Sequence, residues 1–280
     1  MLATLQSVLR KAQRGRYAVG AFNVSNLEHI QAVVAAAADL RSPAIINTSE
    51  KAIAYAGHAD LAAIVRSLAK QVRVPLVLNL DHGRSYLAAD QCLRHGWTGI
   101  MFDGSKLSYE QNVAVTTRVK RRAARFQIGT EGEIGQVKYK EDLAKSAVPV
   151  LATPDQAVDF VRRTKVDALA VGIGNSHGLP VPGERLHFGL LKRIRAAVNV
   201  PLVLHGASGT SPASIRRAVQ LGICKINIDT DLRLAFTRAV RRVLRDRSVY
   251  DPREYLISGR QEMMEVVKQK MILFGSRGKG

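Results

Sequence analysis

Three histidines, His82, His177 and His205, are each followed directly by a glycine and lie at or just after a short apolar run. The segments are L-V-L-N-L-D-H-G, A-V-G-I-G-N-S-H-G and P-L-V-L-H-G. Short apolar runs bounded by glycine are typical of β-strands, and the glycine lets the backbone turn or approach a ligand. If the three strand ends converge, neutral imidazoles would bind a catalytic zinc ion and leave a fourth position for substrate. Asp81, beside the first histidine, would transfer protons.

Eight short apolar runs alternate along the chain with longer helical patterns. The predicted strands are residues 18–23, 44–48, 76–80, 99–102, 127–131, 168–172, 202–205 and 225–228. The predicted helices include an opening amphipathic helix and residues 28–38, 59–71, 86–95, 112–124, 154–164 and 261–274. This alternation over 280 residues predicts an α/β fold, a single (β/α)₈ TIM barrel domain spanning residues 1–280, with 250–280 as a C-terminal helical tail.

A doubly wound open sheet is the competing arrangement. It would place a glycine-rich dinucleotide turn after an early strand, whereas the nearest similar pattern, Gly172-x-Gly174, comes late in the chain. In a barrel, by contrast, the carboxyl ends of all strands face one mouth, where the chemistry takes place. The polar residues at the predicted strand ends are Asn23, Ser49, Asp81, His82, Asp103, Glu131, Glu133, His177, His205, Asn227 and Asp229. A hydrophobic core would not select that set.

Two predicted helix starts near the end of the chain point to an anionic ligand. After His205 comes G-A-S-G-T-S-P-A-S, with Ser211 as the expected N-cap and Pro212 as the first helical residue. After the next strand, Thr230 or Asp231 is the expected cap. Free backbone N–H groups at helix starts bind phosphate, and the loops after strands seven and eight are the habitual phosphate site of these barrels. His95 also precedes a glycine, but its context indicates the C-terminus of a helix.

Several motifs together resemble the class II, metal-dependent ketose-bisphosphate aldolases, most closely the fructose-bisphosphate aldolases. The motifs are N-L-D-H-G, M-F-D-G-S, E-G-E-I-G, G-N-S-H-G, P-L-V-L-H-G-A-S-G and K-I-N-I-D-T-D-L-R-L-A-F, in the family's order over nearly the whole chain. By this resemblance His82, His177 and His205 match the zinc ligands, and Asp81 matches the acid/base on the C4 hydroxyl. Asp103 and Glu133 match the pair that holds a second or displaced divalent metal.

The resemblance also implies a substrate pocket. Its matching residues are Asn23, Ser49, Gly178, Gly206, Ala207, Ser208, Asn227, Ile228, Asp229, Thr230 and Arg260. Gly178, Gly206 and Ser208 would also lie near the family's monovalent cation, and Arg260 would reach the far phosphate, in some members across a subunit boundary. Glu141 would protonate or deprotonate the dihydroxyacetone-phosphate carbon.

The implied reaction is reversible cleavage of fructose 1,6-bisphosphate to dihydroxyacetone phosphate and glyceraldehyde 3-phosphate, through an enediolate stabilised by zinc. The chain departs from the family at Lys138 and Tyr139, where a Gly-Gly pair is usual, and at L-P-V-P-G after His177. Asp229 resembles the fructose branch, with tagatose-1,6-bisphosphate as the alternative substrate.

Two further readings remain at this stage. A Schiff-base aldolase would need a buried lysine at the barrel mouth, for which Lys225 is the strand candidate. A basic, non-catalytic nucleic-acid-binding barrel is suggested by the net charge of +19, although aromatic residues are not interleaved with the arginines. Nucleic acid is therefore not the expected partner.

Composition narrows the setting of the protein. The two cysteines, Cys92 and Cys224, are too few for a disulfide framework or a thiolate metal cluster and fit a cytoplasmic location. No apolar stretch approaches the length of a transmembrane helix, so we expect no membrane association. A homo-oligomer, a dimer or a tetramer, acting on a phosphorylated sugar is the expected assembly.

Overall fold

The computed structural model describes residues 1–139, 150–178 and 185–280. Within these ranges, parallel strands close into a barrel in the order β1-β10-β9-β7-β5-β4-β3-β2. The barrel strands are β1 (Val19–Asn23), β2 (Ala44–Ser49), β3 (Leu76–Gly83), β4 (Gly99–Phe102), β5 (Gly129–Ile134), β7 (Ala168–Val171), β9 (Leu202–Leu204) and β10 (Ile223–Ile228). The predicted (β/α)₈ barrel is therefore confirmed, and the open sheet is wrong.

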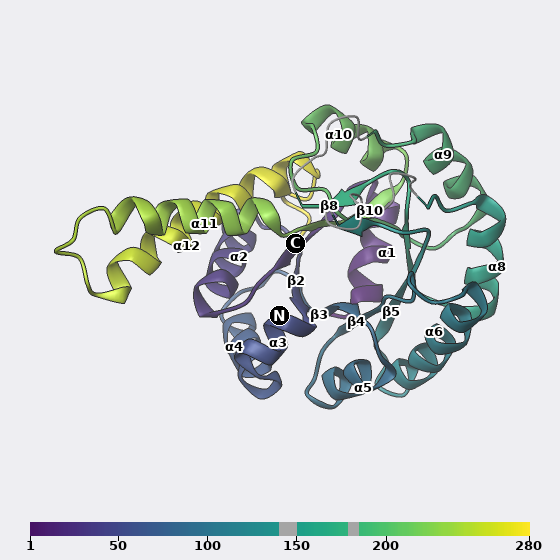
Figure 1. Ribbon diagram of the computed structural model, residues 1–280, viewed down its shortest axis with the longest axis horizontal. Helices are drawn as coiled ribbons and strands as arrows, with labels where there is room; N and C mark the ends of the chain where they lie inside the picture. The colour runs from purple at the N-terminus through teal and green to yellow at the C-terminus, as the bar shows by residue number, and fades with distance from the viewer. Residues whose placement is uncertain (140–149, 179–184) are drawn as a thin grey trace.

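Helices cover the outside of the barrel (Figure 1). They are α2 (Leu27–Asp39), α3 (Glu50–Ala56), α4 (His58–Lys70), α5 (Tyr86–Arg94), α6 (Tyr109–Ala124), α8 (Pro154–Thr164), α9 (Phe188–Ala197) and α10 (Pro212–Gln220). Capping fixes several of their starts: Ser108 and Thr153 each form a capping box with the glutamine three residues later. Two long helices, α11 (Thr230–Val243) and α12 (Pro252–Leu273), pack against each other and project from the barrel as an arm (Figure 1).

The opening helix, α1 (Leu5–Gly15), closes the end of the barrel opposite the candidate site. Its buried face, Leu5, Val8, Leu9 and Ala12, packs into one cluster with residues that point into the barrel, among them Val77. The remaining apolar core fills the layer between the strands and the outer helices. Since α1 seals one end, the mouth at the carboxyl ends of the strands is the accessible end.

Side chains alternate along each strand, so every second residue points into the barrel. On β3 this series begins with Val77, beside α1, and continues through Asn79 to Asp81 near the mouth. Asn79 Nδ2 donates a hydrogen bond to Asn47 Oδ1 on β2, at 2.9 Å. The barrel interior thus changes from apolar beside α1 to polar near the mouth, where the chemical groups gather.

Several predicted boundaries were wrong. The most consequential is β3, which continues beyond Leu80 to Gly83, so Asp81 and His82 lie within the strand. Pairing continues because β3 shifts register against β4 between Leu80 and Gly83, a bulge that no apolar pattern signals. The C-terminal helix begins at Pro252 rather than residue 261, with Asp251 as its N-cap. The Asp-Pro pair was the missed start signal.

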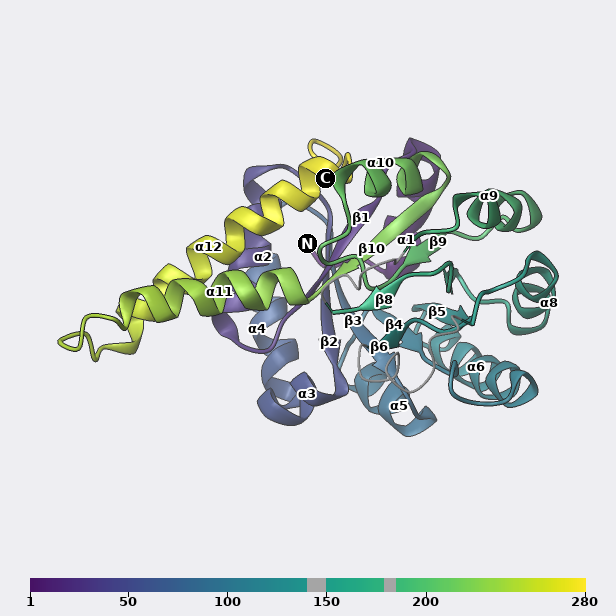
Figure 2. The ribbon, with the colours of Figure 1, turned by 45° about the horizontal axis from the view of Figure 1, so that its top comes forward.

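A further small sheet lies outside the barrel: β6 (Lys138–Tyr139) pairs in parallel with β8 (Ser176–His177) (Figure 2). The sequence placed His177 at the end of the strand that is β7. In the structure His177 instead lies on a separate strand, β8. Among the described residues, the structure has no helix long and apolar enough to cross a membrane. Cys92 and Cys224 are both buried and free.

One buried histidine gives a stability prediction. His29 on α2 is 9% exposed and lies edge-on to Phe236 of α11, with ring centroids 4.7 Å apart. Burial and the charge of Arg233 lower its pKa from 6.5 to about 4. The unfolded chain thus binds a proton between pH 6.5 and 4 that the folded chain does not, and stability falls as the pH falls through this window. We expect the loss attributable to His29 to be about 3 kcal/mol.

Denaturant titrations at pH 7 and pH 4 of the wild type and of His29→Gln check this expectation. Glutamine does not titrate, so the variant should lose less stability on acidification than the wild type. Equal losses in both proteins would contradict the assignment.

Candidate active site

The bulge in β3 sets the direction of the first predicted ligand. His82 has a φ of 49°, in the left-handed region that a side chain other than glycine rarely adopts. The following glycine is required for a different reason than the predicted turn: a Cβ on Gly83 would lie 2.9 Å from the carbonyl oxygen of Met101. Gly83 therefore permits the tight contact between β3 and β4, and His82 is the residue that adopts the left-handed backbone conformation.

His177 is brought to the mouth by Asn175. The Asn175 side chain accepts a hydrogen bond from the Ile173 amide at 2.9 Å and donates one to the His205 carbonyl, also at 2.9 Å. A residue with a Cβ at position 206 would collide with the Ser176 carbonyl, and Gly206 has a φ of 59°. The glycine after His205 thus permits the close approach of β8, whereas the sequence suggested only a turn or the approach of a ligand.

The three predicted histidines converge. Ligand atoms of His82, His177 and His205 all lie within 4.8 Å of one another. The ring centroid of His82 is 4.9 Å from that of His177 and 4.7 Å from that of His205. Such a set of imidazoles from separate strands is the donor set that a catalytic transition-metal ion prefers.

A second group shares His82. His82, Asp103 and Glu133 also offer ligand atoms within 4.8 Å of one another. His82 Nδ1 lies 2.8 Å from Asp103 Oδ2, and Glu133 Oε2 lies 3.4 Å from Nδ1 of His205. Among the described residues, Glu133 Oε2 has no hydrogen-bond partner although it is buried. A buried carboxylate oxygen in that condition fits a site that a cation occupies.

The pKa values of the site residues indicate which protons a metal ion would displace when it binds. Burial disfavours a charged His82, but the charge of Asp81 and the hydrogen bond to Asp103 outweigh it and raise the pKa of His82 to about 9. Burial and the nearby Asp103 carboxylate raise the pKa of Glu133 to about 8. Burial lowers the pKa of His205. Burial and the charge of His82 lower the pKa of His177 well below 6.5. A cation that binds His82 at neutral pH therefore releases a proton.

An ion pair below the histidines supports His205. Glu131 Oε1 lies 2.8 Å from His205 Nε2, and Lys225 Nζ donates to Glu131 Oε2 at 2.7 Å. All three side chains are 0% exposed. With Nε2–H donating to Glu131, the lone pair of Nδ1 faces His82 and the mouth. The sequence placed Glu131 at a strand end but gave it no role; its spacing of two from Glu133 was the available signal.

We expect Glu131→Gln to weaken metal binding by roughly 10- to 100-fold, because His205 loses the charged partner that orients it. Chelator competition at fixed pH measures the metal dissociation constant. The substitution also leaves the Lys225 ammonium buried without its counter-ion, which is destabilising.

The double variant Glu131→Gln, Lys225→Met separates the two effects. Removing both charges should restore stability while metal binding remains weak. Wild-type metal affinity in a folded Glu131→Gln protein would contradict a positioning role for Glu131.

Asp81 is held between two amides. Asn23 Nδ2 donates to Asp81 Oδ2 at 2.8 Å, and Asn227 Nδ2 donates to Oδ1 at 2.9 Å. The carboxylate is 5% exposed, and although burial opposes ionisation, the charges of His82 and Lys225 lower its pKa. Asp81 is thus an ionised carboxylate with a fixed direction, beside the histidine group.

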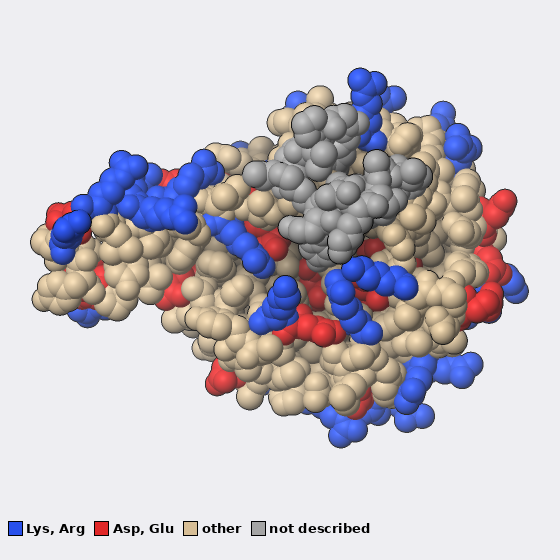
Figure 3. Space-filling model, in the orientation of Figure 1, with Lys and Arg blue, Asp and Glu red and all other residues tan. Residues whose placement is uncertain are grey.

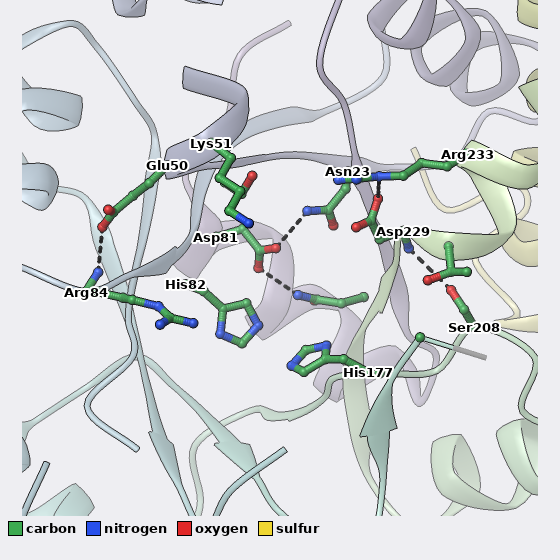
Figure 4. A pocket seen from close by; sticks show the side chains of 15 residues that line it. Asn23, Glu50, Lys51, Asp81, His82, Arg84, His177, Ser208, Asp229 and Arg233 are labelled. Atoms are coloured by element: carbon green, nitrogen blue, oxygen red, sulfur yellow. Dashed lines mark hydrogen bonds and ion pairs between the residues drawn. The ribbon is translucent and has the colours of Figure 1, made fainter. Parts of the chain in front are cut away.

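A cavity of about 710 Å³ opens over these groups (Figure 4). Its lining residues are Asn23, Ser49, Glu50, Lys51, Asp81, His82, Arg84, His177, Gly178, Gly206, Ser208, Asn227, Asp229, Thr230 and Arg233. Most predicted substrate residues are in this set. Ala207 and Ile228 are buried behind it, and Arg260 lies on α12, where Nη1 donates to Gln31 Oε1 at 2.8 Å. The cations Lys51, Arg84 and Arg233 were missed, although Lys51 lies two residues after the end of β2 and Arg84 directly follows β3.

The two predicted anion loops differ in outcome. Ser211 caps α10 as predicted, with its hydroxyl accepting from the Ser214 amide. Thr230 and Asp231 do not cap α11: the N-cap is Asp229, whose carboxylate instead pairs with Arg233 at 2.5 Å. The hydroxyl of Ser208 accepts long 3.4 Å bonds from the amides of Asp229 and Asp231. Glu141 lies outside the described residues.

A family model described as "Fructose-bisphosphate aldolase class-II" matches residues 3–279. The chain belongs to this family. The class II aldolases are generally metal dependent, in agreement with the histidine and carboxylate groups at the mouth of this barrel. This aldolase is therefore a lyase, and a Schiff-base mechanism is not supported. Lys225 is fully buried, paired with Glu131 and absent from the residues lining the cavity.

Solved structures of other aldolases resemble this one. The YdjI aldolase of Escherichia coli K12 is 35% identical, with a TM-score of 0.90, covering 100% of this chain and 99% of that one. A putative fructose-1,6-bisphosphate aldolase from Coccidioides immitis is 29% identical, with a TM-score of 0.90 and coverage of 99% and 97%. Fructose-bisphosphate aldolase from Campylobacter jejuni is 25% identical, with a TM-score of 0.86 and coverage of 100% and 97%.

Proposed function

We propose that this aldolase is zinc dependent and cleaves fructose 1,6-bisphosphate reversibly to dihydroxyacetone phosphate and glyceraldehyde 3-phosphate. The observation that carries the proposal is the position of the Asp81 carboxylate beside three converging imidazoles, two of which, His82 and His177, line the same cavity as Asp81. The relatives named as fructose-bisphosphate aldolases support the choice of substrate. Tagatose 1,6-bisphosphate is the alternative.

His82, His177 and His205 would hold the catalytic ion, and Asp103 and Glu133 would hold a second or displaced one with His82. When bound, zinc would supply a Lewis acid that polarises the ketose carbonyl. His205 presents Nδ1 rather than Nε2 to that site, because Nε2 lies against Glu131.

Asp81 is the proposed general base and acid. In cleavage its carboxylate takes the proton from the C4 hydroxyl, and in condensation it returns that proton. Asn23 and Asn227 keep both carboxylate oxygens within the cavity and favour the ionised form. Glu141 is the proposed group that moves the proton on the dihydroxyacetone-phosphate carbon.

The phosphate of dihydroxyacetone phosphate would lie at the ends of β8, β9 and β10. The proposed contacts are Gly178, Gly206, Ala207, Ser208, Asn227, Ile228, Asp229 and Thr230. A monovalent cation would lie near Gly178, Gly206 and Ser208. The amides of Asp229 and Asp231 now make only long bonds to Ser208, so a phosphate oxygen could replace that hydroxyl. A fixed backbone site of this kind favours a phosphorylated substrate.

The substrate proposal predicts a higher kcat/KM for fructose 1,6-bisphosphate than for its tagatose epimer. A coupled cleavage assay on both sugars, with metal analysis of the same preparation, measures this. EDTA should abolish turnover, and borohydride with substrate should leave the protein unlabelled. A clear preference for tagatose 1,6-bisphosphate would overturn fructose 1,6-bisphosphate as the substrate. Activity retained without metal would overturn the metal-dependent mechanism.

The assembly and location are proposed as a cytoplasmic homo-oligomer, either a dimer or a tetramer. Arg260 lies on α12 of the projecting arm and does not line the cavity of its own chain. A second chain packed against the arm could place this arginine at a neighbouring site, and sedimentation of the purified protein tests the oligomeric state.

A further inference from the structure

The cavity has two sides with different chemistry. In the closed strand order, β3 lies across the barrel from β9, and β2 is next to β3 while β10 is next to β9. The β9 and β10 side contributes Gly206, Ser208 and Asp229, the proposed phosphate site. The opposite side contributes Lys51 and Arg84, which follow the ends of β2 and β3. Figure 4 shows these two side chains beyond Asp81 and His82, away from Ser208.

Lys51 and Arg84 are the cations lining the cavity whose charge no ion pair neutralises within the described residues. Within the described residues, neither side chain forms an ion pair, whereas the third lining cation, Arg233, is paired with Asp229 at 2.5 Å. The surface view shows lysine and arginine side chains bordering the hollow, with acidic groups deeper inside (Figure 3). Two exposed cations beside one cavity attract an anion.

The neighbouring carboxylate does not cancel this charge by direct pairing. Glu50 also lines the cavity, but its Oε1 accepts the backbone amide of Arg84 at 2.7 Å. That bond joins the residues after β2 to those after β3. It therefore fixes the backbones that carry Lys51 and Arg84 close to each other, while leaving both cationic groups available.

We propose that Lys51 and Arg84 bind an anionic group at the far end of the aldehyde fragment and so determine which sugars this enzyme cleaves. The proposal rests on the proposed function, because it takes the β9 and β10 side as the site of the ketose phosphate. The substrate class is then a ketose phosphate whose other end carries a phosphate or a carboxylate. Arg84 suits either group, since its guanidinium donates two parallel hydrogen bonds to an oxyanion.

Condensation of dihydroxyacetone phosphate with different aldehydes tests the proposal on the metal-loaded enzyme. The aldehydes are D-glyceraldehyde 3-phosphate, a four-carbon hydroxyaldehyde ending in a carboxylate, and neutral D-glyceraldehyde. The variants are Lys51→Met, Arg84→Met and the double variant, and Lys70→Met removes an exposed charge of α4 outside the cavity as a control.

For the preferred anionic aldehyde we expect each single variant to lower kcat/KM by about 10- to 100-fold, the effect of losing one charged hydrogen bond. The loss with neutral D-glyceraldehyde should be at least tenfold smaller, and Lys70→Met should behave as wild type. The anionic aldehyde that the wild type prefers identifies the group as phosphate or carboxylate.

Equal losses with neutral and anionic aldehydes, or no loss with either, in variants of an active enzyme would overturn the role of Lys51 and Arg84 alone. A wild type that condenses dihydroxyacetone phosphate with none of the three aldehydes would overturn the proposed function and this inference together.

Discussion

Asp81→Asn is expected to lower kcat for aldol cleavage by roughly 10²- to 10⁴-fold while the protein keeps its metal. This is the range that a positioned general acid or base contributes. The carboxylate does not belong to either described metal group, so its loss should not empty the site. Steady-state cleavage kinetics and metal analysis of one preparation measure both quantities.

The asparagine variant also changes hydrogen bonding in a defined way. Asn23 and Asn227 each donate to one oxygen of Asp81, and an amide at position 81 offers one oxygen and one NH₂ group. One of the two neighbours must therefore flip its amide. Asp81→Ala removes this conflict and should show the same loss of turnover with metal retained.

Asp60→Asn is a suitable control because this exposed carboxylate lies in the first turn of α4, away from the cavity. It should cleave substrate as the wild type does. If Asp81→Ala and Asp81→Asn both retain near-normal turnover, proton transfer belongs to another group.

His177→Ala is expected to leave the purified protein with little bound metal and little activity. The variant retains His82 and His205, but two histidines are fewer than the three protein ligands that a catalytic zinc site requires. The decrease in metal affinity should exceed the roughly 10- to 100-fold that loss of an outer-shell partner causes. Metal content after dialysis, followed by chelator competition, measures it.

His95→Ala is the matched control. His95 also precedes a glycine, but it is the C-cap of α5, and Gly96 has a φ of 89°. This variant should keep its metal and its turnover, since only its helix end is affected. Normal metal content in His177→Ala would remove His177 from the ligand set.

The alternation of apolar runs with helical patterns correctly predicted the barrel, because a parallel sheet with helices between its strands needs that order. The strand boundaries were less accurate. β3 continues through Asp81 and His82 because a bulge lets a polar segment remain paired with β4. His177 lies on β8, which is placed by Asn175 rather than by continuation of β7. Neither feature leaves a hydrophobic period in the sequence.

The same limit explains the residues that the sequence did not assign. Glu131 and Lys225 are 94 positions apart, and their pairing beneath His205 exists only once the barrel closes. Among the described residues, Lys51 and Arg84 differ from other surface cations in that they line the cavity without an ion pair. Sequence gives the type of each charge but not which neighbour neutralises it.

The sequence by itself determined the fold class, the three histidines and the adjacent aspartate, because residue type and strand period are local properties. The tertiary structure decided which nitrogen of His205 faces the site, the raised pKa of His82 and the division of the cavity into two sides. These properties depend on distances between strands far apart in the chain, such as β3 and β9. Only closure of the barrel sets those distances.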